Sequence, residues 1–122
     1  MKAYIAGKLW EESERKILEQ IAKFCKDNQI ETFLPHRDAG IYKSGSSKNF
    51  FEKDSKEIDN CKLMIAVLDW KYVGSGTAWE IGYAYAKNIP IIALVEDLES
   101  VKTYDRMCTM VFNSVKMFDS LE

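Results

Sequence analysis

The sequence predicts an α/β protein built on a doubly wound parallel sheet. Short apolar segments and amphipathic segments alternate four times along the 122 residues, and strands that alternate with helices are typical of parallel sheets. The clearest unit is the apolar run 63–68, which ends in Asp69 and is followed by the glycine-containing sequence 74–76. This order is typical of a buried strand whose carboxyl end meets the start of a helix.

The first elements follow from the same patterns. Residues 2–6 are apolar and end in Gly7, which predicts a central strand that leads into a turn. In 11–28 apolar residues recur at helical spacing with charged residues on the opposite face, which predicts a helix. Residues 30–34 predict a second strand, which Pro35 ends.

The segment 35–49 is polar and predicts a long loop, and loops of that length are usually functional lids or disordered. A helix is expected at 49–60, with Phe51, Ile58 and Cys61 on one face.

The second half of the chain repeats the alternation. We expect a strand at 63–68, a helix at 77–87 and a strand at 90–95. The tail 102–122 is ambiguous, and one interpretation is a helix from about Arg106 followed by an edge strand at 115–118.

Composition narrows the function classes. Residues 1–122 are expected to form one domain, with 47% hydrophobic residues and a net charge of −2. That charge gives no reason to expect nucleic acid or a membrane surface as partner, and no apolar run is long enough to span a bilayer or to serve as a signal peptide. Cys25, Cys61 and Cys108 show neither metal nor disulfide spacing, which favours a reducing cytoplasm and no metal site.

Glu80 is the most informative candidate residue. Open α/β sheets bind ligands at the carboxyl ends of their strands, and Asp69 and Glu80 would meet there, which suggests acid/base or nucleophilic chemistry. Two interpretations of Glu80 remain open. With Thr77 it matches a capping box, in which it would only satisfy a backbone N–H. Alternatively, a helix N-terminus keeps it ionised so that it attacks an electrophilic carbon.

Four further residues have alternative interpretations. Asp54 shares the apolar helical face, so it is buried, paired or directed into a cavity, unless it reaches water at the edge of that face. Tyr4 is a core residue whose hydroxyl needs a partner, which a carboxylate could supply. Asp69 is either a solvated loop residue or part of a site, and His36 is either a surface residue or a substrate contact. Three tryptophans could stack on a base or cover the sheet ends: Trp10, Trp70 and Trp79.

Several segments match one family pattern. They are Tyr4-Ile-Ala-Gly7 with Trp10, Leu34-Pro-His-Arg-Asp38, Asp54, the run from Cys61 to Asp69, and Gly76-Thr-Ala-Trp-Glu-Ile-Gly-Tyr-Ala84. Through them nearly the whole chain resembles the nucleoside 2-deoxyribosyltransferase family. The resemblance implies a flavodoxin-like five-stranded parallel sheet with helices on both faces. It also implies a homo-oligomer whose active sites are shared between subunits.

The resemblance further implies a mechanism without cofactor or metal. Glu80 would attack C1′ of a 2′-deoxyribonucleoside, assisted by Asp69 as acid and by Tyr4, which positions the nucleophile. The sugar would then pass from Glu80 to a second base, so the partners are a nucleoside or nucleotide and a free nucleobase. Other residues are expected to bind the substrate: Gly7, Lys8, Trp10, His36, Arg37, Asp38, Asp54, Gly74, Ser75, Gly76, Cys108 and Met110.

Two departures leave the activity open. Gly74 stands where most transferases of this kind carry an aspartate, and Cys108 stands where an asparagine is expected before Met110. Related deoxynucleotide N-hydrolases also lack that aspartate, and Ser75 and Lys8 could bind a 5′-phosphate. The alternatives to a transferase are therefore a hydrolase of the same fold and a non-catalytic nucleotide-binding module.

Overall fold

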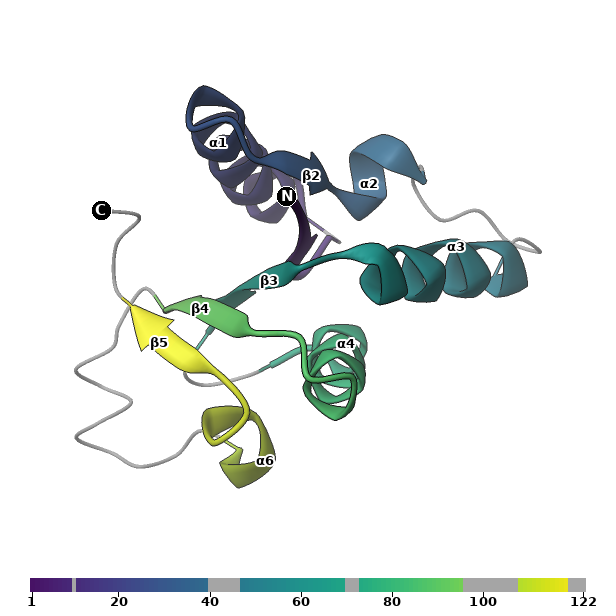
Figure 1. Ribbon diagram of the computed structural model, residues 1–122, viewed down its shortest axis with the longest axis vertical. Helices are drawn as coiled ribbons and strands as arrows, with labels where there is room; N and C mark the ends of the chain where they lie inside the picture. The colour runs from purple at the N-terminus through teal and green to yellow at the C-terminus, as the bar shows by residue number, and fades with distance from the viewer. Residues whose placement is uncertain (10, 40–46, 70–72, 96–107, 119–122) are drawn as a thin grey trace.

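The computed structural model describes residues 1–9, 11–39, 47–69, 73–95 and 108–118. Five strands form one sheet in the order β2-β1-β3-β4-β5 (Figure 1), and every neighbouring pair is parallel. The strands are β1 (Lys2–Ala6), β2 (Glu31–Phe33), β3 (Leu63–Leu68), β4 (Ile91–Val95) and β5 (Lys116–Phe118). This is the flavodoxin-like strand order, so the predicted fold class is confirmed.

Helices cover both faces of the sheet (Figure 1). Helix α1 (Glu12–Asp27) packs on one face, where Leu18 and Ile21 form a cluster with Ala3 and Ile5 of β1. On the other face, α3 (Ser47–Asn60) and α4 (Ser75–Ala86) pack against Tyr4, Met64 and Ala66. The side chains of a strand alternate between the two faces, so the apolar run of β3 contributes to both clusters. The other helices of the described residues are α2 (Pro35–Asp38) and α6 (Thr109–Phe112).

The segment after β2 differs from the predicted loop over 35–49. Residues 35–38 form the short helix α2, since Pro35 at its first position already has a helical φ. The Asp38 carboxylate accepts a hydrogen bond of 2.9 Å from the Leu34 backbone N–H at the start of this turn. Helix α3 also begins at Ser47, two residues before its predicted start, while 40–46 lie outside the described residues.

The start of α4 is the difference that matters most for function. Gly74, not Thr77, precedes the helix, and its carbonyl accepts the first helical hydrogen bond from the Ala78 N–H at 2.9 Å. Thr77 is therefore the third helical residue, and its side chain is buried. The predicted capping box of Thr77 and Glu80 is wrong, because Glu80 lies in the second turn of α4.

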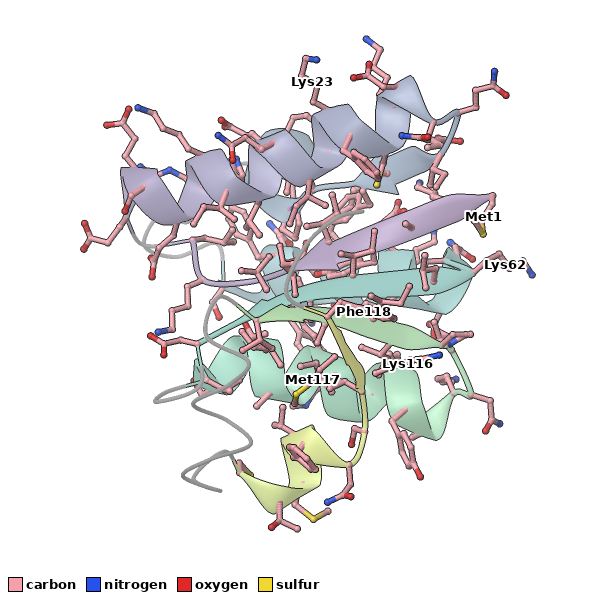
Figure 2. All side chains as sticks on the ribbon, turned by 90° about the vertical axis from the view of Figure 1, so that its left-hand side faces the viewer. Met1, Lys23, Lys62, Lys116, Met117 and Phe118 are labelled. Atoms are coloured by element: carbon pink, nitrogen blue, oxygen red, sulfur yellow. The ribbon has the colours of Figure 1, made fainter. Side chains whose placement is uncertain are left out.

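Figure 2 shows the end of the sheet at which β1 and β3 begin. Met1 and Lys62 lie together at the amino ends of β1 and β3, and Lys23 points outward from α1. The polar residues that follow β1 and β2 lie at the opposite edge, the carboxyl ends at which parallel sheets bind ligands. In the described part of the chain, no helix is long and apolar enough to cross a membrane.

We expect the core contact under α3 to be important for stability. Ile58 is fully buried between α3 and the sheet, so Ile58→Ala should lower the free energy of unfolding by about 2–5 kcal/mol. Ile17 on α1 is 40% exposed, so Ile17→Ala should cost roughly 1 kcal/mol or less. Urea unfolding of both variants measures the difference, and equal losses would contradict the assigned core.

Candidate active site

A cavity of about 710 Å³ opens at the carboxyl ends of the strands. It is lined by residues that follow β1 and β2, by one side of α3 and by the first two turns of α4. This volume is in the range of small-molecule sites. The predicted site residues among its lining are Gly7, Lys8, His36, Asp54, Gly74, Ser75, Gly76 and Glu80.

The Tyr4 hydroxyl donates a hydrogen bond to Oε2 of Glu80. Tyr4 belongs to the face of β1 that packs against α4, and its side chain is fully buried. Its ring stacks on Phe33 of β2, with the ring centres 5.4 Å apart. The predicted pairing of Tyr4 with a carboxylate is therefore observed, and two strands fix the hydroxyl that holds Glu80.

The environment of Glu80 raises the pKa of its carboxyl to about 7. Removal from water is the main cause, and the nearby Asp54 carboxylate acts in the same direction. The Tyr4 hydroxyl opposes both, because its hydrogen bond favours the ionised form. Glu80 was expected in the first turn of its helix, where the helix dipole would favour the ionised form, but it lies in the second turn of α4, beyond the range in which that dipole mainly acts. Near neutral pH both protonation forms are populated.

Asp54 is the second carboxyl group of the cavity. It lies on α3 one turn before Ile58, and its Oδ1 is buried without a hydrogen-bond partner among the described residues. Burial raises its pKa to about 6, with a smaller increase from Glu57 and an opposing effect of Lys53. Of the interpretations left open by the sequence, the structure favours a carboxyl directed at the cavity over one that reaches water. Such a group can deliver a proton in weakly acidic solution.

Three other predicted residues lie away from the cavity lining. Asp69 is exposed at the end of β3. Arg37 and Asp38 are exposed on α2 and pair with each other at 2.6 Å, which holds the pKa of Asp38 below its usual range. Arg37 also donates to the Thr32 carbonyl at 2.8 Å, so existing partners hold it on the outside of β2.

Cys108 and Met110 are also outside the lining, and Met110, a residue of α6, is 77% exposed. Their expected role in a neighbouring subunit remains a prediction. Trp10 and Trp70 lie outside the described residues.

The aromatic rim of the cavity was only partly expected. Phe51 is predicted to share one apolar helical face with Ile58, but it is 57% exposed and lines the cavity, whereas Ile58 is fully buried. It meets Trp79 edge to face, with ring centres 5.3 Å apart, and Trp79 stacks on Tyr83 at 5.0 Å. These rings could provide an apolar wall for a flat ligand.

A surface position is the default expectation for His36, but its side chain is only 7% exposed. It lines the cavity and contacts Glu19 of α1, with 3.0 Å between Nε2 and Oε1.

Sequence reasoning also missed several lining residues. They are Leu9, Arg15, Pro35, Ser47, Phe50, Ser55 and Thr77. The only available signal was their position shortly after a strand or on the cavity side of a helix.

Among the residues that the structure describes, no group of three His, Cys, Asp or Glu could hold a metal ion. Two carboxyl groups line this cavity, and one of them accepts a hydrogen bond from Tyr4. Such a pair is suited to nucleophilic attack with acid assistance when the first is ionised and the second is protonated.

The fold and the sequence both have known relatives. The 2-deoxyribosyltransferase of Bacillus psychrosaccharolyticus superposes with a TM-score of 0.81 and 21% identity, over 98% of this chain and 87% of that chain. The 2-desoxiribosyltransferase of Leishmania mexicana gives 0.75 and 21%, over 98% and 91%. The CMP N-glycosidase of Clostridium botulinum gives 0.61 and 20%, also over 98% and 91%.

At these identities the structural similarity shows the fold alone. No curated protein matches the sequence significantly. The family model for nucleoside 2-deoxyribosyltransferase, however, matches residues 3–120, almost the full length. The chain therefore belongs to the nucleoside 2-deoxyribosyltransferase family.

Proposed function

We propose that the protein cleaves the N-glycosidic bond of 2′-deoxyribonucleosides and passes the deoxyribosyl group to another base. One observation carries this proposal: Glu80 lines the cavity, is held by the Tyr4 hydroxyl, and is accompanied there by the carboxyl group of Asp54. Family membership supports the same class of reaction.

In the proposed first step, ionised Glu80 attacks C1′ of the nucleoside. The C1′–N bond breaks, its electron pair leaves with the base, and an ester forms between C1′ and the Glu80 carboxylate. Tyr4 keeps the attacking carboxylate in place. A second base then attacks C1′, gives its N–H proton to the group that protonated the first base, and releases Glu80 as a carboxylate. Two inversions therefore give net retention, as in retaining glycosidases.

We assign the acid role to Asp54 and not to Asp69. Asp54 lines the cavity, and its raised pKa of about 6 leaves part of it protonated in weakly acidic solution, where it can give a proton to the leaving base. Asp69 is exposed outside the lining, although it lies at the end of β3 as expected. The binding-module alternative rests on the departures at Gly74 and Cys108 and leaves Glu80 only a capping role, which its position in the second turn of α4 does not fit.

A second candidate is a hydrolase for deoxynucleoside 5′-monophosphates, in which water attacks the ester. The observation that favours it is the start of α4 at the cavity, where Gly74 brings no side chain and Ser75, Gly76 and Thr77 begin the helix. Helix N-termini bind phosphate groups through their backbone N–H groups and dipole. Lys8 lies close by, with 3.6 Å between its Cγ and the position of a Cβ on Gly74.

The shared site expected from the family is also part of the proposal. Cys108 and Met110 would line the cavity of a neighbouring copy, since both are exposed in this chain.

Product analysis separates the two activities. Deoxynucleosides and their 5′-monophosphates are incubated with and without a second free base, and the products are separated by chromatography. A new nucleoside that forms only with the second base is the expected result for a transferase, whereas free base without a new nucleoside identifies the hydrolase. If neither forms from any substrate, both proposals fail.

Glu80→Gln should lower turnover by about a thousandfold or more, because an amide cannot form the ester. The free energy of unfolding should change by only about 1 kcal/mol, since the amide oxygen still accepts from Tyr4. Turnover and urea unfolding of the variant provide both measurements. Retained turnover would contradict the role of Glu80 as nucleophile.

The pH profile of kcat/KM should be bell-shaped. The reaction needs Glu80 ionised and Asp54 protonated, and their pKa values are about 7 and about 6, so activity should peak between these two values. Asp54→Asn should remove the alkaline limb. The remaining limb should have its midpoint below about 7, because the Asp54 charge that raises the pKa of Glu80 is gone. An alkaline limb that persists in this variant would assign the acid elsewhere.

Gly74→Asp tests the second candidate. A Cβ at Gly74 would be in ordinary contact with Lys8, so the variant should fold. A carboxylate at the start of α4 should repel a phosphate and raise the KM for 5′-monophosphates by about tenfold or more, with a smaller effect on nucleosides. The isosteric Gly74→Asn is the matched uncharged control. Equal effects on phosphorylated and unphosphorylated substrates in both variants would rule out a phosphate at this helix.

A further inference from the structure

His36 lines the cavity with its two ring nitrogens in different situations. Nε2 lies 3.0 Å from Oε1 of Glu19. Nδ1 is buried and has no hydrogen-bond partner among the described residues. A buried polar atom without a partner costs stability, so its presence at a ligand cavity calls for an explanation. A bound ligand that supplies the missing partner is the explanation consistent with the rest of the site.

Glu19 determines what that ligand must offer. A carboxylate only accepts hydrogen bonds, so Nε2 of His36 must carry the hydrogen. In a neutral imidazole the other nitrogen, Nδ1, then has a lone pair and can only accept. The ligand group that satisfies it is consequently an N–H or O–H donor.

The sheet places His36 away from the nucleophile. His36 follows β2, Tyr4 is on β1, and Glu80 comes from α4 after β3, while the strand order is β2-β1-β3. A nucleoside with C1′ at Glu80 therefore has room to extend its base toward the β2 side of the cavity. The base edge that is remote from the sugar carries the group at C4 of a pyrimidine or C6 of a purine.

We propose that Glu19, acting through His36, selects bases with an exocyclic amino group on this edge, namely cytosine and adenine. An amino group donates to Nδ1, whereas the oxo group of uracil or hypoxanthine presents a second lone pair and is repelled. Glu19 is a positioning residue in this scheme, because it contacts His36 and not the base. The inference rests on the proposed function, since it assumes a nucleoside in the cavity.

The first test reads the tautomer without any turnover. His36 is the only histidine of the chain, so nitrogen-15 NMR gives a single pair of ring signals. At about pH 8 the wild type should show a protonated Nε2 and an unprotonated Nδ1. Glu19→Gln should introduce the other tautomer, because a glutamine amide can donate to Nε2. A wild type with Nδ1 protonated would overturn the inference.

The second test compares substrate pairs that differ at this edge. The kcat/KM for deoxycytidine should exceed that for deoxyuridine by at least about tenfold, and the same difference should separate deoxyadenosine from deoxyinosine. In Glu19→Gln both ratios should fall toward one. Glu12→Gln is the matched control on the same helix, since Glu12 pairs only loosely with Lys16 at 3.6 Å, and it should keep the wild-type ratios.

The outcomes separate this inference from the proposed function. If all four substrates react with ratios near one, or if Glu19→Gln leaves the ratios unchanged, base selection by Glu19 is wrong while the deoxyribosyl chemistry stands. If neither member of either pair reacts, with or without a 5′-phosphate, the proposed function fails and the inference fails with it.

Discussion

The site depends on one carboxylate that is held away from water. Glu80 faces a cavity from the second turn of α4, and its closest fixed partner is the hydroxyl of Tyr4 from the central strand. Tyr4 can reach it only because alternate residues of β1 point toward α4 and because Phe33 of the neighbouring strand stacks on its ring. The sheet therefore fixes the position of the Glu80 carboxyl group through Tyr4, and burial raises the pKa of this group to about 7.

The carboxyl groups of Glu80 and Asp54 influence each other. Each is partly removed from water, and the negative charge of Asp54 makes ionisation of Glu80 harder. A protonated Asp54 and an ionised Glu80 is the combination that nucleophilic displacement of a base requires. The packing of Ile58 keeps the α3 helix, and so Asp54, against the same face of the sheet that carries Tyr4. The core residue Ile58 and the site residue Asp54 therefore lie one turn apart on the same helix.

Much of this arrangement could be predicted from the sequence because it follows from periodicity. The buried run of β3 predicted the parallel sheet, and the spacing between Asp54 and Ile58 predicted a carboxyl on an apolar face. The start of α4 could not be predicted. Thr77 and Glu80 fit a capping box in the sequence, but the residue that precedes the helix is Gly74, which has no side chain to cap it. The burial of His36 could not be predicted either, since its surroundings form only in the folded chain, where it contacts Glu19 from 17 residues earlier in the sequence.

The most direct test of this account is to trap the covalent intermediate. The protein is mixed with a 2′-deoxyribonucleoside that it consumes, quenched rapidly in acid, and analysed by intact and peptide mass spectrometry. The account predicts a gain of one deoxyribosyl group on the peptide that contains Glu80, lost on addition of an acceptor base and absent from the Glu80→Gln variant. An adduct on another residue, or undiminished turnover by that variant, would contradict it.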